Sequence, residues 1–258
     1  MTTCAIMQPT YLPWIGYFAL IDLVDVFVFL DDVQLVKQSW QTRNRIKRQD
    51  GEELILSVPI SRALGIQERM IKDVEISDGT PWVTKHLRSF EQYYRRAPHF
   101  AEAMALYEPV LRGHGSKLCD LSIALIEAIA TGIGIRANRR LRSSEIADKS
   151  TARSDRLVDI CHHVGADVYL SPAGSAEYLI EADGAAQFKE HHIDLLYRSY
   201  QHPVYPQLHG PFRSHLCILD LLANVGVANA AAVIRSGIRA SVRTPAELSS
   251  DTLSQEAV

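Results

Sequence analysis

The stretch Thr3–Leu30, TCAIMQPTYLPWIGYFALIDLVDVFVFL, decides the fold class of this chain. It begins with a short apolar run, Thr3–Met7, which predicts a strand leading into a loop. Apolar residues then recur at helical spacing over Pro13–Val24, and proline is favoured in the first turn of a helix. The run Val26–Leu30 is β-branched and aromatic throughout, which predicts a fully buried strand. Strand, helix and strand in this order predict a βαβ unit.

The next part of the chain has a different pattern, which predicts an antiparallel insertion over residues 41–76. Polar and apolar residues alternate over Gln41–Lys47 and Glu53–Ile60, with the turn sequence Gln49-Asp50-Gly51 between them. This pattern predicts a hairpin, and we expect Ile71–Ile76 to add a third strand. Over residues 81–135 the apolar spacing becomes helical and predicts a helical segment. Its expected helices are Pro81–Arg96, Phe100–Leu111 and Ser116–Thr131.

Strand and helix patterns alternate again in the last part of the chain. The expected strands are Arg139–Ser144, Asp167–Ser171 and Ile193–Tyr200, and the expected helices are Ser154–Val164, Leu216–Val225 and Ala228–Ser236. The predicted fold class is therefore α/β: a mostly parallel sheet flanked by helices, with an antiparallel hairpin insertion and a helical segment. We expect a single domain over residues 1–243 and a polar, disordered tail over residues 244–258.

Composition and charge exclude several classes of protein. The chain has 258 residues, 47% of them hydrophobic, and a net charge of −3 without a block of like charge, so nothing predicts general nucleic-acid binding. Acidic residues interrupt the longest apolar stretches, and the N-terminus lacks the pattern of a signal peptide, so we expect no membrane association. The four cysteines are scattered without a CxxC pair, which predicts no disulfide framework and favours a cytoplasmic location.

The loop after the first strand is the first candidate site. In open α/β sheets ligands bind at the carboxyl ends of strands, where the amides at a helix N-terminus suit phosphate. We therefore expect Gln8 and Tyr11 to bind substrate. Gly16 lies inside the expected helix, at a cost of roughly 1 kcal/mol against alanine, which close approach of a ligand or a second helix would explain. The alternative is a structural turn with aromatic core packing.

Two adjacent acids follow the second expected strand. Asp31 and Asp32 are expected at the same sheet edge, where one of them would face the site because strand neighbours alternate. Adjacent acids can hold a metal or position a substrate amine or hydroxyl, and Asp32 is a candidate general base. Further substrate-binding candidates follow in the chain: Lys37, Trp40, Arg43 and Asn44. The alternative is an exposed loop with a solvated basic face.

The remaining candidates lie in later segments. Ser171 ends an expected strand. A cluster that precedes it, Lys149-Ser150-Thr151 with Arg153 and Arg156, is suited to phosphate but lacks Walker spacing, and Lys149 and Arg153 are its chosen binding residues. A proline-stiffened loop, His202–Phe212, carries His202 as a candidate general base and Tyr205 and His209 as substrate-binding candidates, although such loops are more often structural. Substrate binding is also predicted for His86, on an expected helix, whereas His162-His163 and His191-His192 are expected to be surface pairs. No metal site is predicted.

Several of these segments together resemble the WbqC-like family, over about Ala5 to Ser236. The matching sequences are QPTYLPWIGYF, LDDVQ, SWQTRNRIK, WVTKH, GADVYLS, HPVYPQLHGPF and LDLLANVG, in this order. The resemblance implies a bacterial protein associated with polysaccharide or natural-product biosynthesis. It supplies no agreed reaction and no catalytic residues, but it implies that the motif residues line one site.

These observations favour a transferase that moves an acyl or aminoacyl group from an activated donor to an amine or hydroxyl of a sugar or metabolite. The alternatives are a nucleotide-dependent ligase or nucleotidyltransferase, and a non-catalytic partner in a biosynthetic complex. The cofactor, the donor and the oligomeric state stay open. One geometric expectation can be checked directly. The QPTYLPW loop, Asp31-Asp32 and the end of Asp167–Ser171 should meet in one cleft, with the hairpin as a wall and His202–Phe212 closing over it.

Overall fold

A five-stranded parallel sheet forms the centre of the part of the chain that the structure, a computed structural model, describes: residues 1–36, 39–61, 69–135, 139–151, 153–172 and 184–242. Its strands lie in the order β5 (Arg139–Arg142), β2 (Val26–Phe29), β1 (Thr3–Met7), β6 (Val168–Ser171) and β7 (Asp194–Tyr197). Parallel pairing confirms the predicted βαβ unit, because Cys4–Met7 lie in register with Val26–Phe29.

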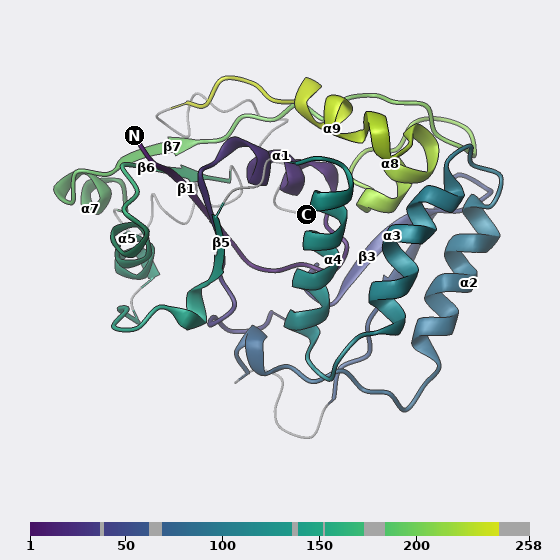
Figure 1. Ribbon diagram of the computed structural model, residues 1–258, viewed down its shortest axis with the longest axis horizontal. Coiled ribbons are helices and arrows are strands. Elements are labelled where there is room, and N and C mark those ends of the chain that lie inside the picture. The colour runs from purple at the N-terminus through teal and green to yellow at the C-terminus, as the bar shows by residue number, and fades with distance from the viewer. Residues whose placement is uncertain (37–38, 62–68, 136–138, 152, 173–183, 243–258) are drawn as a thin grey trace.

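Helices cover both faces of the sheet, as Figure 1 shows. On one face Ala5, Phe27 and Phe29 pack in the larger core with α1 (Ile15–Leu23) and α4 (Leu118–Gly132). On the other face the alternate strand residues, Cys4, Ile6, Val26 and Val28, pack with α5 (Arg153–Val164) and α7 (Gly184–Glu190). This alternation explains the continuous apolar strands, because a parallel strand buried on both sides has no solvent face.

The chain makes a long excursion between β2 and β5. A hairpin of β3 (Arg43–Lys47) and β4 (Glu53–Ser57) forms a separate antiparallel sheet, as predicted. The helices α2 (Trp82–Tyr94), α3 (Phe100–Arg112) and α4 follow, and α8 (Ile218–Val225) and α9 (Val227–Ser236) later pack beside α3 and α1. The predicted third strand, Ile71–Ile76, is wrong: residues Ile71–Asp73 form a 3-10 turn, η2, and Ile76 makes only an isolated bridge to Ile60 within the described residues. The predicted tail, residues 244–258, lies outside the described residues.

The strand order places a topological switch point between β1 and β6. From β1 the chain continues to β2 on one side, whereas from β6 it continues to β7 on the other side. The connections after these two neighbouring strands therefore diverge and leave a crevice at their carboxyl ends. Ligands of open α/β sheets bind at this position.

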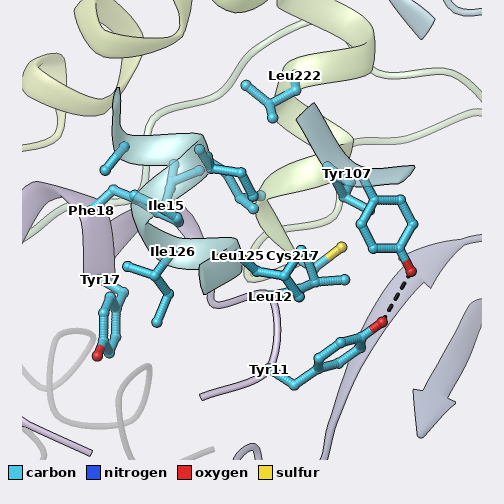
Figure 2. Close-up of a cluster of buried hydrophobic side chains, with 14 of the residues drawn as sticks. Tyr11, Leu12, Ile15, Tyr17, Phe18, Tyr107, Leu125, Ile126, Cys217 and Leu222 are labelled. Atoms are coloured by element: carbon cyan, nitrogen blue, oxygen red, sulfur yellow. Dashed lines mark hydrogen bonds between the residues drawn. The ribbon is translucent and has the colours of Figure 1, made fainter. Parts of the chain in front are cut away.

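The loop between β1 and α1 is packed into the core. Tyr11, Leu12, Ile15 and Phe18 are buried beside side chains of α3, α4 and α8, and Figure 2 shows the hydrogen bond that joins Tyr11 to Tyr107 at its edge. Burial on all sides explains the almost uniformly apolar sequence of α1. Among the described residues no helix is both long enough and apolar enough to cross a membrane.

Candidate functional site

A cavity of about 680 Å³ lies at the switch point. Its size is within the range of small-molecule sites, about 300–1,000 Å³. The carboxyl ends of β1, β2 and β6 contribute to its wall, together with the start of α1, the first turns of α5 and the end of β7. The polar or aromatic lining residues are Gln8, Thr10, Trp14, Tyr17, Asp32, Gln34, Thr151, Arg156, Tyr169 and Arg198. The structure therefore brings together the three strand ends that were expected to meet.

The loop after β1 presents Gln8 and Thr10 to this cavity. The side-chain amide of Gln41 donates a hydrogen bond to the Gln8 side-chain oxygen, and the Tyr17 hydroxyl donates to the Gln8 backbone carbonyl at 3.1 Å. The Thr10 hydroxyl is buried and has no hydrogen-bond partner among the described residues. Gln8 is thus held in place by its own neighbours.

Asp32 supplies a carboxylate to the cavity at the end of β2. Its Oδ2 lies 3.2 Å from the Lys149 ammonium and its Oδ1 lies 3.9 Å from the Arg156 guanidinium. Burial alone would raise the pKa of Asp32, but hydrogen bonds from Ser143 and Lys149 and the charges of Lys149 and Arg156 lower that pKa below its ordinary value. Asp32 is therefore ionised at neutral pH and is a weak base.

Two arginines give the cavity positive charge. Arg156 donates from Nη1 to the Asp32 backbone carbonyl at 2.9 Å and from Nε to the Ser150 carbonyl at 3.1 Å. Arg198 is only 2% exposed, and burial lowers its pKa to about 10, so it keeps its proton at neutral pH. Its guanidinium lies 5.9 Å from the Trp14 ring centroid and 5.2 Å from that of Tyr200. These cation–π contacts stabilise a charge that burial would otherwise disfavour.

Trp14 forms the aromatic part of the wall and explains Gly16. A Cβ at Gly16 would lie 2.2 Å from an atom of the Trp14 ring, so only glycine leaves room for the indole. The glycine is thus required by a side chain two residues earlier. Gly16 also lines the cavity, so the approach of a ligand at this position stays a prediction. Trp14 also stacks on His202, with ring centroids 5.8 Å apart and planes at 13°.

His202 lies behind Trp14 and does not line the cavity. Its Nδ1 donates to the Pro203 carbonyl at 2.9 Å, and its Nε2 accepts from the His215 backbone N–H at 3.2 Å. Burial lowers the pKa of His202 to about 4. A neutral imidazole with both nitrogens occupied holds the loop, and it offers no free nitrogen to a substrate in the cavity.

Asp31 anchors the end of β2 to the turn after β5. It is fully buried, and it accepts hydrogen bonds from the Ser144 backbone N–H at 2.9 Å and from the Ser144 hydroxyl at 2.8 Å. Lys149 acts beside it, donating to the backbone carbonyls of Ser143 and Ile146 as well as pairing with Asp32. Asp31 and Lys149 therefore hold Asp32 and the turn beside it in place, and they do not themselves line the cavity.

Three other predicted binding residues are occupied by internal contacts. Tyr11 is 0% exposed, and its hydroxyl lies 3.0 Å from the Tyr107 hydroxyl (Figure 2). The same hydroxyl lies 2.9 Å from Nδ1 of His86. Nε2 of His86 donates a hydrogen bond to the Ser57 carbonyl and so ends this row of hydrogen bonds. Burial lowers the pKa of His86 to about 4. Asn44 donates to the Tyr11 and Leu12 carbonyls at 3.1 and 2.7 Å, which holds Leu12 at a φ of 48°.

The His202–Phe212 loop packs on the hairpin and α8 through a buried polar cluster, so it does not close over the cavity as expected. Asp220 accepts from the Tyr205 hydroxyl at 2.8 Å, and the buried Lys47 ammonium donates to the Pro211 carbonyl at 2.5 Å. His209, at a φ of 66°, bonds the Tyr93 carbonyl through Nε2 at 2.6 Å and lines a second, smaller cavity.

The remaining predicted residues lie elsewhere. Trp40 packs between the guanidinium groups of Arg43 and Arg45, 5.9 and 5.2 Å from its ring centroid, and none of residues 41–60 lines the switch-point cavity. The hairpin therefore does not form a wall of this cavity within the described residues, contrary to expectation. Gln41 contributes only indirectly, by its hydrogen bond to the Gln8 side chain. Ser171 is fully buried behind Pro172, which does line the cavity. Lys37 and the side chain of Arg153 lie outside the described part of the chain.

A comparison with known protein families identifies the family of the chain. The model of the WbqC-like protein family matches residues 8–232, a range that begins at Gln8 and includes the polar cavity residues named above. The chain belongs to the WbqC-like family. It is 36% identical over 228 residues to the uncharacterized protein Rv1507c of Mycobacterium tuberculosis, an alignment that covers 88% of this chain and 95% of that protein. No solved structure matches the chain.

Several cavity residues of this WbqC-like chain were not among the sequence candidates. Arg198 lies directly after β7 but inside the expected strand Ile193–Tyr200. Within a strand, the sequence pattern gives no sign that a charged residue belongs to a binding site. Thr10, Trp14 and Tyr17 lie in the candidate loop QPTYLPWIGY but were not chosen there as binding residues, because they resemble core packing. Arg156 belongs to the candidate phosphate cluster with Lys149 and Arg153 but was not one of its chosen binding residues. A basic residue within the last few positions of an expected buried strand is the signal that would have found Arg198.

Metal ligands are sparse around the cavity. Among the described residues no three histidine, cysteine, aspartate or glutamate side chains come close enough together to hold a metal ion. All four cysteines are buried, and burial raises the pKa of Cys119 and of Cys217 to about 12. These two thiols are therefore protonated at neutral pH and are unsuited to act as nucleophiles.

Proposed function

We propose that this WbqC-like protein is a biosynthetic transferase that moves an acyl or aminoacyl group from an activated donor to an amine or hydroxyl of a sugar or metabolite. The observation that supports this proposal is the cavity at the switch point, which combines the carboxylate of Asp32 with the guanidinium groups of Arg156 and Arg198. A concave site with a few convergent polar groups is the ordinary form of a small-molecule site. The proposal places the reaction in the cytoplasm.

The charges of the cavity suit a donor whose leaving group is anionic. Arg156 and Arg198 outnumber Asp32 in the lining, and Lys149 contacts Asp32 from behind, so the cavity is locally positive in a chain with a net charge of −3. Guanidinium groups bind phosphate and carboxylate strongly, and they stabilise charge that develops on a leaving group. A donor activated as an acyl phosphate or acyl adenylate meets both requirements.

The proposed step is direct transfer. The lone pair of the acceptor nitrogen or oxygen attacks the carbonyl carbon of the donor, and the bond from that carbon to the leaving phosphate oxygen breaks with its electron pair on that oxygen. The proton of the acceptor passes to solvent. Asp32 has a lowered pKa and is a weak base, so in this scheme it orients the acceptor by accepting its hydrogen bond, and the arginines hold the leaving group.

An activity screen tests the proposal. The protein is incubated with acyl phosphates, acyl adenylates and acyl thioesters in the presence of amino sugars and amines, and products are detected by mass spectrometry. We expect a transfer product that Asp32→Asn and Arg156→Gln each reduce by about tenfold or more, which is the value of one charge-assisted hydrogen bond. Arg48→Gln, on the exposed hairpin turn, serves as the matched control and should keep activity. Equal activity of all three variants would refute the site assignment.

A nucleotide-dependent ligase or nucleotidyltransferase is the second candidate. The specific observation in its favour is the location of the cavity, because the switch point of a doubly wound sheet is where nucleotides bind in many such folds. This reaction would require ATP or another nucleoside triphosphate with magnesium. Calorimetry with ATP and Mg²⁺ separates the candidates: no heat at about 1 mM nucleotide removes the second one, whereas saturable binding with pyrophosphate release favours it.

A further inference from the structure

His162 in α5 and His191, which directly follows α7, meet on the surface, and neither residue lines the switch-point cavity of the proposed transferase site. Nε2 of His162 lies 3.0 Å from Nδ1 of His191, with ring centroids 5.1 Å apart and planes at 68°. Both side chains are exposed. The sequence contains two histidine pairs, His162-His163 and His191-His192. One histidine of each pair takes part in this contact, which the sequence alone did not predict.

The backbone at both histidines is fixed by similar helix ends. At the end of α5, Gly165 has a φ of 70° and the Ala166 N–H bonds the Cys161 carbonyl at 2.9 Å. At the end of α7, His192 has a φ of 56° and the Ile193 N–H bonds the Phe188 carbonyl at 2.9 Å. These are Schellman-type ends, which stop a helix with a defined geometry. The two imidazoles are therefore carried on rigid supports.

The same helix ends favour a cation. His162 lies in the last turn of α5, and His191 directly follows α7. The carboxyl end of a helix carries a partial negative charge, which stabilises positive charge near it. The two imidazoles that meet lie at the carboxyl ends of α5 and α7. Two imidazoles beside the negative ends of the α5 and α7 helix dipoles favour a cation that binds nitrogen ligands.

We propose that His162 and His191 form a two-histidine surface site for a divalent transition metal such as Zn²⁺. Zinc binds histidine nitrogen at about 2.0–2.1 Å with tetrahedral angles, so two nitrogens on one ion lie about 3.3 Å apart. The separation here is 3.0 Å in a hydrogen bond, so the ion would replace the shared proton, and both rings would turn until a lone pair of each points at the ion. Because no third protein ligand lies close among the described residues, water fills the remaining positions. The ion would clamp α5 to α7.

Titration calorimetry of the full-length protein with Zn²⁺ tests this site. We expect saturable binding of one ion for each chain, weakened by about tenfold or more in His162→Gln and in His191→Gln, because each variant removes one of two ligands. The matched controls are His163→Gln and His192→Gln, which change an exposed neighbour and leave the pair intact. Mg²⁺ should give no binding at this site, because it requires oxygen ligands.

Three results would overturn the proposal. They are the absence of saturable Zn²⁺ binding below about 1 mM, unchanged affinity in both pair variants, or an equal loss in the two control variants. All four substitutions are at exposed positions, and circular dichroism confirms the fold of each variant before titration. The switch-point cavity is not involved, so transferase activity should not change with these variants.

Discussion

For Gly16→Ala, helix propensity and side-chain packing predict opposite changes in the free energy of unfolding. Gly16 is the second residue of α1, and alanine in a helix is more favourable than glycine by about 1 kcal/mol. Helix propensity alone therefore predicts that the variant is more stable. The packing of Trp14 predicts the reverse, because the added Cβ would lie 2.2, 2.3 and 2.6 Å from three atoms of the indole.

The size of the effect follows from the surroundings of Trp14. Carbon atoms in contact lie about 3.5–4.0 Å apart, so the indole has to retreat by about 1 Å or more. His202 stacks on it at 5.8 Å between centroids, Tyr200 meets it edge-on at 5.5 Å and His215 lies at 4.6 Å. Overpacking of this kind costs about 1–3 kcal/mol, and a ring confined on several sides belongs near the upper value. After the gain in propensity we expect a net destabilisation of about 2 kcal/mol.

Urea unfolding of four proteins measures this coupling: the wild type, Gly16→Ala, Trp14→Leu and the double variant. In the Trp14→Leu background the clash is removed, so Gly16→Ala should be neutral or stabilising, and the interaction energy should be about 1–3 kcal/mol. Gly115→Ala is the control, because no atom lies within 4 Å of a Cβ at that position. If Gly16→Ala is as stable as the wild type, the account of Trp14 as a fixed wall of the cavity is refuted.

Two further predictions concern the buried polar groups. Asp220→Asn should lower the free energy of unfolding by about 1–3 kcal/mol in urea titration, because Asp220 accepts from Tyr94, Tyr205 and Gln207 at 2.7–2.8 Å and an amide cannot satisfy these donors together. A loss below about 0.5 kcal/mol, the size of an ordinary surface substitution, would contradict this. His86 is 5% exposed, and burial lowers its pKa from 6.5 to about 4. Above pH 6.5 the imidazole is neutral in both the folded and the unfolded chain. As the pH falls toward 4 only the unfolded chain takes up the proton, so the free energy of unfolding falls by about 3 kcal/mol. His86→Gln should therefore show a shallower loss of stability than the wild type between pH 6.5 and 4, and parallel curves would contradict the lowered pKa.

The strands and most helices could be predicted because their periodicity is set by burial. Thr3–Met7 is predicted to the residue, and the predicted Asp167–Ser171 differs from β6 by one residue at its start. The predicted strand Ile71–Ile76 fails because a 3-10 turn interrupts it at Ile71–Asp73. Residues 74–76 then reach different neighbours, since Glu75 bridges to Lys117 and Ile76 bridges to Ile60. β-branched composition reports burial, but it does not report whether a partner strand continues alongside.

The location of the site could be predicted better than its members. The carboxyl ends of parallel strands share one edge, so Gln8 and Asp32 were correctly expected in one cavity. Tyr11, Asn44 and His202 were chosen for the same reason, namely polar chemistry near a strand end or in a stiff loop. In the folded chain their polar atoms are taken by backbone carbonyls, another tyrosine and a backbone amide. A sequence shows which residues carry polar groups, but the partners of those groups depend on contacts between distant segments.

If the switch-point cavity binds the anionic group of the donor, inorganic pyrophosphate should bind there, and titration calorimetry measures that binding. We expect saturable binding at one site that Arg156→Gln weakens by about tenfold or more, since one charge-assisted hydrogen bond contributes about 1.5–3 kcal/mol. Arg96→Gln is the matched control, because Arg96 lines the second cavity of about 310 Å³ beside His209. Pyrophosphate binding by Arg156→Gln as tight as that of the wild type, or a loss that appears in Arg96→Gln instead, would show that the anion does not bind in the switch-point cavity.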